Sequence, residues 1–178
     1  MAITFPLSLS GFFAPLAVAE ITFDLAEAMS VTETGGGEVL RASHGPRLWQ
    51  GHVTVRARTY LDLDRLLARV EILRQPGASF LVHPRHRRGP QADPEGTALG
   101  SASPTITALA ANNREITLAG LPGGYVLTEG DLIGFSYLSN PTRRALHRIM
   151  ETRTATSGGN ISGIEVSPPV RPGASWPR

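Results

Sequence analysis

The residues of this chain that could bind a metal ion are five histidines: His44, His52, His83, His86 and His147. A zinc site on a helix needs two histidines on one face, as in the spacing His-Glu-x-x-His. The closest pair, His83 and His86, flanks Pro84 on a segment expected to be a loop, and the chain has no cysteine that could complete a thiolate site. The sequence therefore predicts no metal-binding and no cofactor-binding residues.

The sequence also contains no motif in which the side chains of a hydrolytic enzyme have the required spacing. A nucleophilic serine needs a Gly-x-Ser-x-Gly elbow, and glycosidases need two facing carboxylates. Asp62 and Asp64 are the best acidic pair, but they lie near the start of an apolar helical repeat, where the helix dipole favours carboxylates. The run 35–37 is Gly-Gly-Gly without the Lys-Ser/Thr of a phosphate loop, and Asp93-Pro-Glu-Gly96 predicts a turn and not a calcium loop. We predict no catalytic residues and a protein that is not an enzyme.

A basic run, Arg85-His-Arg-Arg88, is the one candidate for contact with phosphate groups. It has no interleaved aromatic residues, and Asp93 and Glu95 follow closely. The formal net charge is only +2 over 178 residues, which is not the charge of a DNA-binding protein. The run is therefore predicted to be a solvated loop or one side of a subunit contact.

The composition indicates a single β-rich domain over residues 1–178. Nineteen glycines and fourteen prolines favour turns and short strands, and a charged content of 18% predicts that other subunits cover part of the surface. Residues 12–19 are apolar, but Pro6 and Pro15 flank or interrupt the segment and no basic residue precedes it. We therefore expect no membrane insertion, and two or three short strands over residues 2–34, with Ile3, Phe5, Leu7 and Leu9 alternating in the first of them. The glycine run at 35–37 predicts a flexible turn after these strands. A secreted β-domain, cleaved after Ala19, is the alternative.

One helix and several short strands follow from the periodicity. Leucines and valines recur at three- and four-residue steps over 61–74, which predicts an amphipathic helix ended by Pro76-Gly77. Alternating residues predict a strand from Val53, and short strands are expected at 80–82, 116–118, 125–127, 132–137, 145–150 and 161–166. The segment 84–104 is rich in proline and poor in apolar residues, so it is predicted to be a long loop or an extended arm. One hypothesis for such an arm is that it bridges neighbouring subunits. Residues 168–178 contain four prolines and are predicted to form an extended strap.

The order of short segments in the second half resembles a pattern of structural proteins from long, non-contractile phage tails. The segments are Gly120-Leu-Pro, Gly124-Tyr-x-Leu-x-x-Gly-Asp-Leu-Ile133, Leu146-His-Arg-Ile149 and Pro168-Pro-Val-Arg-Pro172. Upstream, Trp49-Gln-Gly-His-Val53, the predicted helix and Pro76-Gly-Ala-Ser-Phe80 also fit, so the resemblance covers residues 48–173. The chain is similar to the distal tail protein and tail-tube family of siphophages.

This resemblance implies a tail-tube-like β-barrel or sandwich with one packed helix. It also implies a homohexameric ring around a channel, with other tail proteins as partners and DNA present only in transit. A distal tail protein, the ring between the tail tube and the tail tip in the virion, is the leading interpretation. A major tail tube subunit is the alternative, since the chain lacks the second domain of larger distal tail proteins. A carbohydrate-binding or cell-surface-binding module is a further alternative, although aromatic residues make up only 6% of the chain.

Overall fold

The computed structural model describes residues 3–85, 87–137 and 142–171. The chain divides into two compact units: unit 1 is Met1–Asp24 with Gln50–His86, and unit 2 is Leu25–Trp49 with Arg87–Arg178. The sequence predicts one domain over 1–178. Chain length cannot reveal this division, because each unit is assembled from two segments that lie far apart in the sequence.

Unit 1 opens with a helical turn and not with the predicted strand. The prediction of a strand from Ile3 to Leu9 is wrong: Leu7 makes only an isolated bridge to Phe80, and a π-helical turn, η1 (Leu9–Phe13), follows. Phe12 and Phe13 are both buried in this turn, with ring centroids 5.0 and 6.5 Å from that of Phe80. In a strand, adjacent residues point to opposite faces. A helical turn allows both rings to be buried in one cluster.

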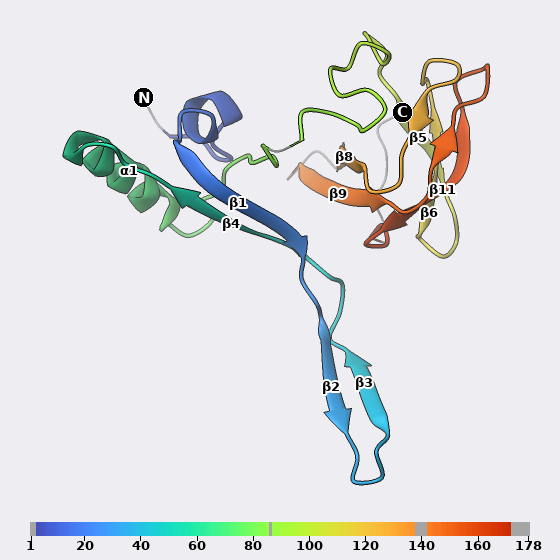
Figure 1. Ribbon diagram of the computed structural model, residues 1–178, viewed down its shortest axis with the longest axis horizontal. Helices are drawn as coiled ribbons and strands as arrows, with labels where there is room; N and C mark the ends of the chain where they lie inside the picture. The colour runs from blue at the N-terminus through green and yellow to red at the C-terminus, as the bar shows by residue number, and fades with distance from the viewer. Residues whose placement is uncertain (1–2, 86, 138–141, 172–178) are drawn as a thin grey trace. The chain divides into compact units, whose positions relative to one another are not determined.

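The rest of unit 1 follows the predicted order more closely. Strand β1 (Val18–Leu25) pairs with β4 (Trp49–Val55), and the helix α1 (Tyr60–Leu73) confirms the predicted helix within one residue at each end (Figure 1). The side chain of Thr59 caps this helix by accepting a hydrogen bond from the N–H of Asp62 at 3.2 Å. The predicted strand at 80–82 is reduced to the bridge at Phe80.

Unit 2 contains an antiparallel sheet of five strands in the order β5-β6-β11-β9-β8 (Figure 1). Two pairs of strands accompany it, β2 with β3 and β7 with β10. The strands of the unit are β2 (Met29–Glu33), β3 (Val39–Ser43), β5 (Thr105–Leu109), β6 (Glu115–Ala119), β7 (Val126–Leu127), β8 (Leu132–Tyr137), β9 (Arg143–Ile149), β10 (Arg153–Thr154) and β11 (Ile161–Ser167).

The fold is mainly β with one α-helix, as predicted. Of the barrel and the sandwich that the sequence left open, the described residues form no closed barrel and are compatible with a sandwich-like fold. The five strands predicted after residue 115 all have counterparts, whereas β3, β5 and β10 were not predicted. The core of unit 2 lies between the five-stranded sheet and the segment that contains β7 and β10. It consists of Ile116, Leu118, Leu121, Tyr125, Leu127, Ile149, Ala155, Ile161, Ile164, Val166 and Val170.

The segment 84–104 has no helix and no strand in its described residues, as predicted, but it is not a free arm. Asp131 is 2% exposed and holds the loop through its carboxylate, which accepts hydrogen bonds from the N–H groups of Gln91 and Thr128, both at 2.9 Å. The Gln91 side chain donates to the Glu129 carbonyl, and Arg87 donates to the Gly130 carbonyl, both at 2.8 Å. Polar contacts thus fix this loop to unit 2, since the loop itself has few apolar residues.

A second carboxylate organises the loop from within. Asp93 is buried and accepts hydrogen bonds from the N–H groups of Leu99 and Ala98, at 2.9 and 3.1 Å, and from the Thr97 hydroxyl at 3.4 Å. Burial tends to raise the pKa of Asp93, but these hydrogen bonds outweigh it and hold the pKa below its usual value. Burial, and then the charges of Asp93 and Asp131, raise the pKa of the Tyr125 hydroxyl. The turn predicted at residues 93–96 is therefore confirmed, and its aspartate has a structural role.

The predicted C-terminal strap is described as far as residue 171, and residues 172–178 lie outside the described part of the chain. Val170 is 2% exposed, and its N–H donates to the Asn113 carbonyl at 2.7 Å. The Pro168 carbonyl accepts a hydrogen bond from His147 Nδ1 at 2.6 Å. The start of the strap is therefore fixed to unit 2.

Candidate functional site

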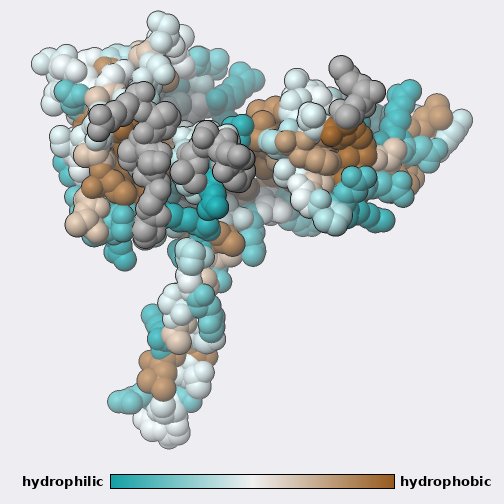
Figure 2. Space-filling model, turned by 180° about the vertical axis from the view of Figure 1, so that it is seen from behind, coloured by the Kyte–Doolittle hydropathy of each residue, from teal (hydrophilic) through white to brown (hydrophobic). Residues whose placement is uncertain are grey.

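The hairpin formed by β2 and β3 is the most unusual surface of the molecule. All ten residues of its two strands are exposed, and four of them are large and apolar: Met29, Val31, Val39 and Leu40. Brown apolar side chains are visible along the hairpin in Figure 2. A two-stranded hairpin is marginally stable alone, and an exposed apolar strand edge is a template for pairing with another chain. The β2–β3 hairpin is therefore a candidate assembly surface.

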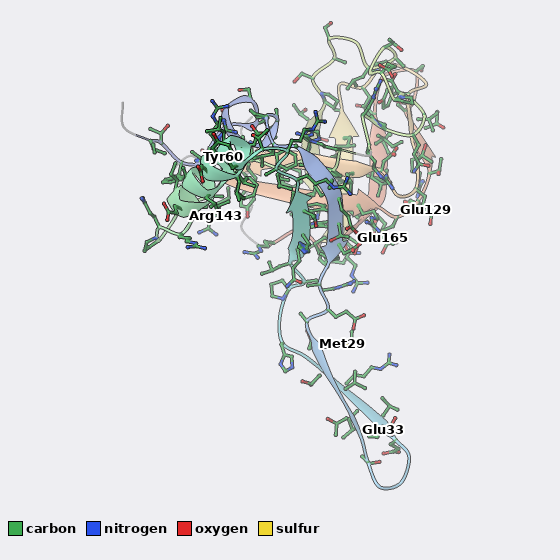
Figure 3. All side chains as sticks on the ribbon, turned by 60° about the vertical axis from the view of Figure 1, so that its left-hand side comes forward. Met29, Glu33, Tyr60, Glu129, Arg143 and Glu165 are labelled. Carbon is green, nitrogen blue, oxygen red and sulfur yellow. The ribbon has the colours of Figure 1, made fainter. Side chains whose placement is uncertain are left out.

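The hairpin is regular over its whole length. Five residue pairs run from Met29 opposite Ser43 to Glu33 opposite Val39. The turn is closed at Thr34, whose N–H donates to the Glu38 carbonyl at 2.8 Å and whose hydroxyl accepts from the Glu38 N–H at 3.1 Å. Gly37 has a φ of 81°, a conformation that favours glycine, so the predicted glycine turn is confirmed. Figure 3 shows Met29 toward the base of the hairpin and Glu33 next to its turn.

The helix α1 is a second apolar surface that its own chain leaves uncovered. None of its residues is buried, and Leu61, Leu63 and Leu67 are 53%, 45% and 51% exposed. An amphipathic helix is normally stabilised by burial of its apolar stripe. We therefore count α1 as a further candidate contact surface of unit 1.

Unit 2 also contains a recess of about 430 Å³ that is rich in arginine. Its lining comes from the segment 46–49 after the hairpin, from β8 and β9, and from residues 168–171. Among the described residues, four arginines and no aspartate or glutamate line it; the arginines are Arg47, Arg143, Arg144 and Arg171. We call this site the arginine recess.

Among the described residues, no carboxylate forms an ion pair with an arginine of the arginine recess. Arg47 donates from Nε to the Ala26 carbonyl at 3.0 Å and from Nη2 to the Leu25 carbonyl at 2.8 Å, which fixes its position without cancelling its charge. The ion pairs among the described residues are Arg88–Glu95 and Arg153–Glu151, and neither involves an arginine of the recess. The recess is therefore a candidate site for an anionic group.

Aromatic side chains line part of the same recess. The indole N–H of Trp49 donates to the Leu146 carbonyl at 2.6 Å, and the guanidinium of Arg148 lies 5.5 Å from the centre of the Trp49 ring. The rings of Phe135 and His147 are stacked, with centroids 5.3 Å apart and planes 10° apart. The site therefore combines apolar contact area with a positive charge.

His147 is a buried titratable group in this lining. A backbone carbonyl can only accept, so Nδ1 donates to the Pro168 carbonyl, and within the described residues the buried Nε2 has no hydrogen-bond partner. Burial lowers the pKa of His147, and the bond to Pro168 opposes this shift only in part. The folded protein thus favours the neutral ring.

We predict that His147 makes the protein less stable in mild acid. Because its folded pKa lies below the unfolded value of about 6.5, the unfolded chain takes up the proton first. The contribution to stability is complete above pH 6.5 and falls as the pH drops from 6.5 toward the folded pKa. Urea unfolding at a series of pH values should show this decline in the wild type and in the exposed-residue control His52→Gln, and a weaker decline in His147→Phe. An equal decline in all three would contradict the assignment.

The histidines singled out in the sequence have different local surroundings in the structure. His44 directly follows β3, and its Nε2 bonds to the Ser30 hydroxyl. His83 lies edge-on to the Phe13 ring in unit 1. His86 lies outside the described residues, and in the described part of the chain no three His, Cys, Asp or Glu side chains are placed to hold a metal ion. The predictions of no catalytic and no cofactor-binding residues remain predictions.

The basic run at 85–88 is used internally in its described residues. Arg85 donates to the carbonyls of Phe13 and Ala14 at 2.9 and 2.8 Å, and its guanidinium lies 5.1 Å from the centre of the Phe13 ring. Arg87 bonds to Gly130, and Arg88 pairs with Glu95 at 3.6 Å. Among the described residues of the run, Arg85 therefore bonds within unit 1, and Arg87 and Arg88 bond within unit 2.

The arginine recess could not be found in the sequence, because its residues come from positions near 47, 144 and 171. The triple glycine at 35–37 indicates the turn of the hairpin in the sequence. The strand β3 that follows this turn was not predicted.

Comparison of the chain with protein-family models, with curated proteins and with solved structures gave no match. Within the described residues, no helix has the length and apolar content needed to cross a membrane.

Proposed function

We propose that this chain is a non-enzymatic structural protein of a bacteriophage tail, a distal tail protein whose copies form a ring between the tail tube and the tail tip. The observation that supports this most is the β2–β3 hairpin, with ten exposed strand residues and four exposed large apolar side chains. The resemblance of residues 48–173 to siphophage tail proteins supplies the biological setting.

The exposed apolar surface of the hairpin is the physical reason to expect assembly. Apolar surface is costly to leave in water, at about 25 cal/mol per Å². Contiguous exposed apolar surface on a soluble protein marks a site of contact. We infer that the hairpin of one copy binds a different surface of the next copy, which is a heterologous contact, and heterologous contacts generate closed rings or open filaments. A ring of six copies that contacts other tail proteins, with DNA in transit through its channel, agrees with this geometry.

The same hairpin also suits a major tail tube subunit, which is the second candidate. A tube subunit must stack ring upon ring as well as close one ring, so it needs two further complementary faces. The exposed apolar stripe of α1 is a candidate for one of them. The two candidates differ in whether rings of this protein polymerise.

Negative-stain images of the purified protein test the proposal. Single rings of about six copies are expected for a distal tail protein. Stacked rings or filaments would favour the tube subunit. Particles with no ring, together with binding to bacterial cell-wall glycans, would contradict both and favour a cell-surface-binding module.

A further inference from the structure

We infer that the turn of the β2–β3 hairpin of one copy docks into the arginine recess of a second copy, and that this contact closes the ring. The inference rests on the proposed assembly and goes beyond it by naming the two surfaces that meet. The hairpin tip is residues 33–38, and the recess is the one lined by Arg47, Arg143, Arg144 and Arg171.

Charge is the first argument. The tip has the sequence Glu33-Thr-Gly-Gly-Gly-Glu38, which contains two exposed carboxylates and no cationic residue. The recess has four arginines and no acidic side chain in its lining. Complementary charges of this kind steer association and fix its register. An arginine also binds a carboxylate through two parallel hydrogen bonds, which favours a fixed geometry.

Apolar area is the second argument. Val39 and Leu40 follow the tip directly and are 48% and 56% exposed. In the recess, Leu48 is exposed, and Trp49 and Tyr137 belong to the lining. Binding would therefore cover apolar side chains on both partners while the carboxylates reach the arginines. A free phosphate ion would satisfy only the charge.

The chain cannot place its own tip in its own recess. Pro46 lines the recess and Gly36 lies in the turn, and between them the five residues of β3 alone span roughly 16 Å of extended strand. The pairing from Met29 to Glu33 is uninterrupted, so the hairpin does not bend back along that length. The tip that fills the recess must come from another copy.

A second basic recess, in unit 1, provides a comparison. It is lined by Arg56, Arg58, Arg65 and Arg69, but Asp62 also lines it and it has no aromatic residue. Its charge is thus partly balanced, and its lining suits the apolar side chains of the tip less well. We assign the tip to the arginine recess of unit 2 for these reasons.

Charge reversal on either surface tests the inference. A recess variant carries Arg143→Glu and Arg144→Glu, and a tip variant carries Glu33→Arg and Glu38→Arg. Each should lose self-association by at least about tenfold, because the recess variant cancels the net positive charge of the recess and the tip variant brings like charges together. An equimolar mixture of the two variants should assemble again, since in an alternating ring one contact joins two unaltered surfaces and the next places the new arginines of the tip against the new glutamates of the recess. Sedimentation velocity gives the populations, and circular dichroism shows that each variant is folded.

A control variant with Arg56→Glu and Arg58→Glu carries the same charge change in the unit 1 recess and should assemble like the wild type. If the recess and tip variants also assemble like the wild type, this contact is wrong while the proposed ring stands. If the mixture stays unassembled, or if the control alone loses assembly, the pairing of these two surfaces is overturned. A wild type that stays monomeric and binds inorganic pyrophosphate in the recess would overturn both the second-copy occupant and the ring.

Discussion

Removal of the β2–β3 hairpin is expected to abolish assembly and leave a folded, monomeric chain. Residues 29–43 contribute no buried side chain, and none of them belongs to the core of unit 2. Their ends are already joined, because the N–H of His44 donates to the Ala28 carbonyl at 2.8 Å. An Asn-Gly turn can therefore connect Ala28 to His44 without strain. The mass of the variant in solution, from light scattering, measures the result.

The thermal unfolding curve provides the control for this variant. A cooperative transition close to that of the wild type would show that the loss of assembly is not caused by unfolding. An intermediate variant, Val31→Thr with Leu40→Thr, keeps the hairpin and removes apolar side chains, so it should weaken assembly without abolishing it. Rings of normal mass from the deleted chain would show that the hairpin is not the assembly surface.

Asp131→Ala is expected to lower the free energy of unfolding by about 3 kcal/mol and to release the loop from unit 2. The substitution removes the acceptor of two hydrogen bonds, from the N–H groups of Gln91 and Thr128, and leaves both donors without that partner. The released loop should then be cut faster by trypsin after Arg87 and Arg88. Urea unfolding gives the energy, and limited proteolysis gives the accessibility of the loop.

Glu129→Ala is the matched control for Asp131→Ala. Glu129 lies in the same turn, and its side chain is exposed, so its loss should change the unfolding free energy by less than about 0.5 kcal/mol (Figure 3). Equal stability and equal proteolysis for Asp131→Ala and Glu129→Ala would show that the loop is not anchored by the buried carboxylate. The loop as a free bridging arm, as the sequence predicts, would then regain support.

The elements that could be predicted from the sequence are those whose cause is local. The helix α1 follows from a repeat of apolar residues and a stop at Pro76-Gly77, and β8, β9 and β11 follow from short apolar segments between turns. The turn before β8 is local in the same way, since the Asp131 carboxylate accepts from the N–H of Thr128 three residues earlier. Local patterns of this kind are sufficient to predict the fold class.

The features that escaped prediction depend on distant partners. Phe12 and Phe13 are buried against Phe80, and this packing overrides the alternation of residues 3–9. The loop at 84–104 looked unattached because its anchors, Asp131 and the carbonyls of residues 129 and 130, lie some forty residues away. The residues of the arginine recess come together only in the folded chain, so no spacing in the sequence predicts the recess.

The central claim is that the chain assembles with itself through an exposed hairpin. Sedimentation equilibrium of the purified protein over a range of concentrations tests it most directly. We expect a closed species of about six times the 19.0 kDa chain mass, and this mass should not grow further as the concentration rises. A species of a single chain mass at every concentration would contradict it.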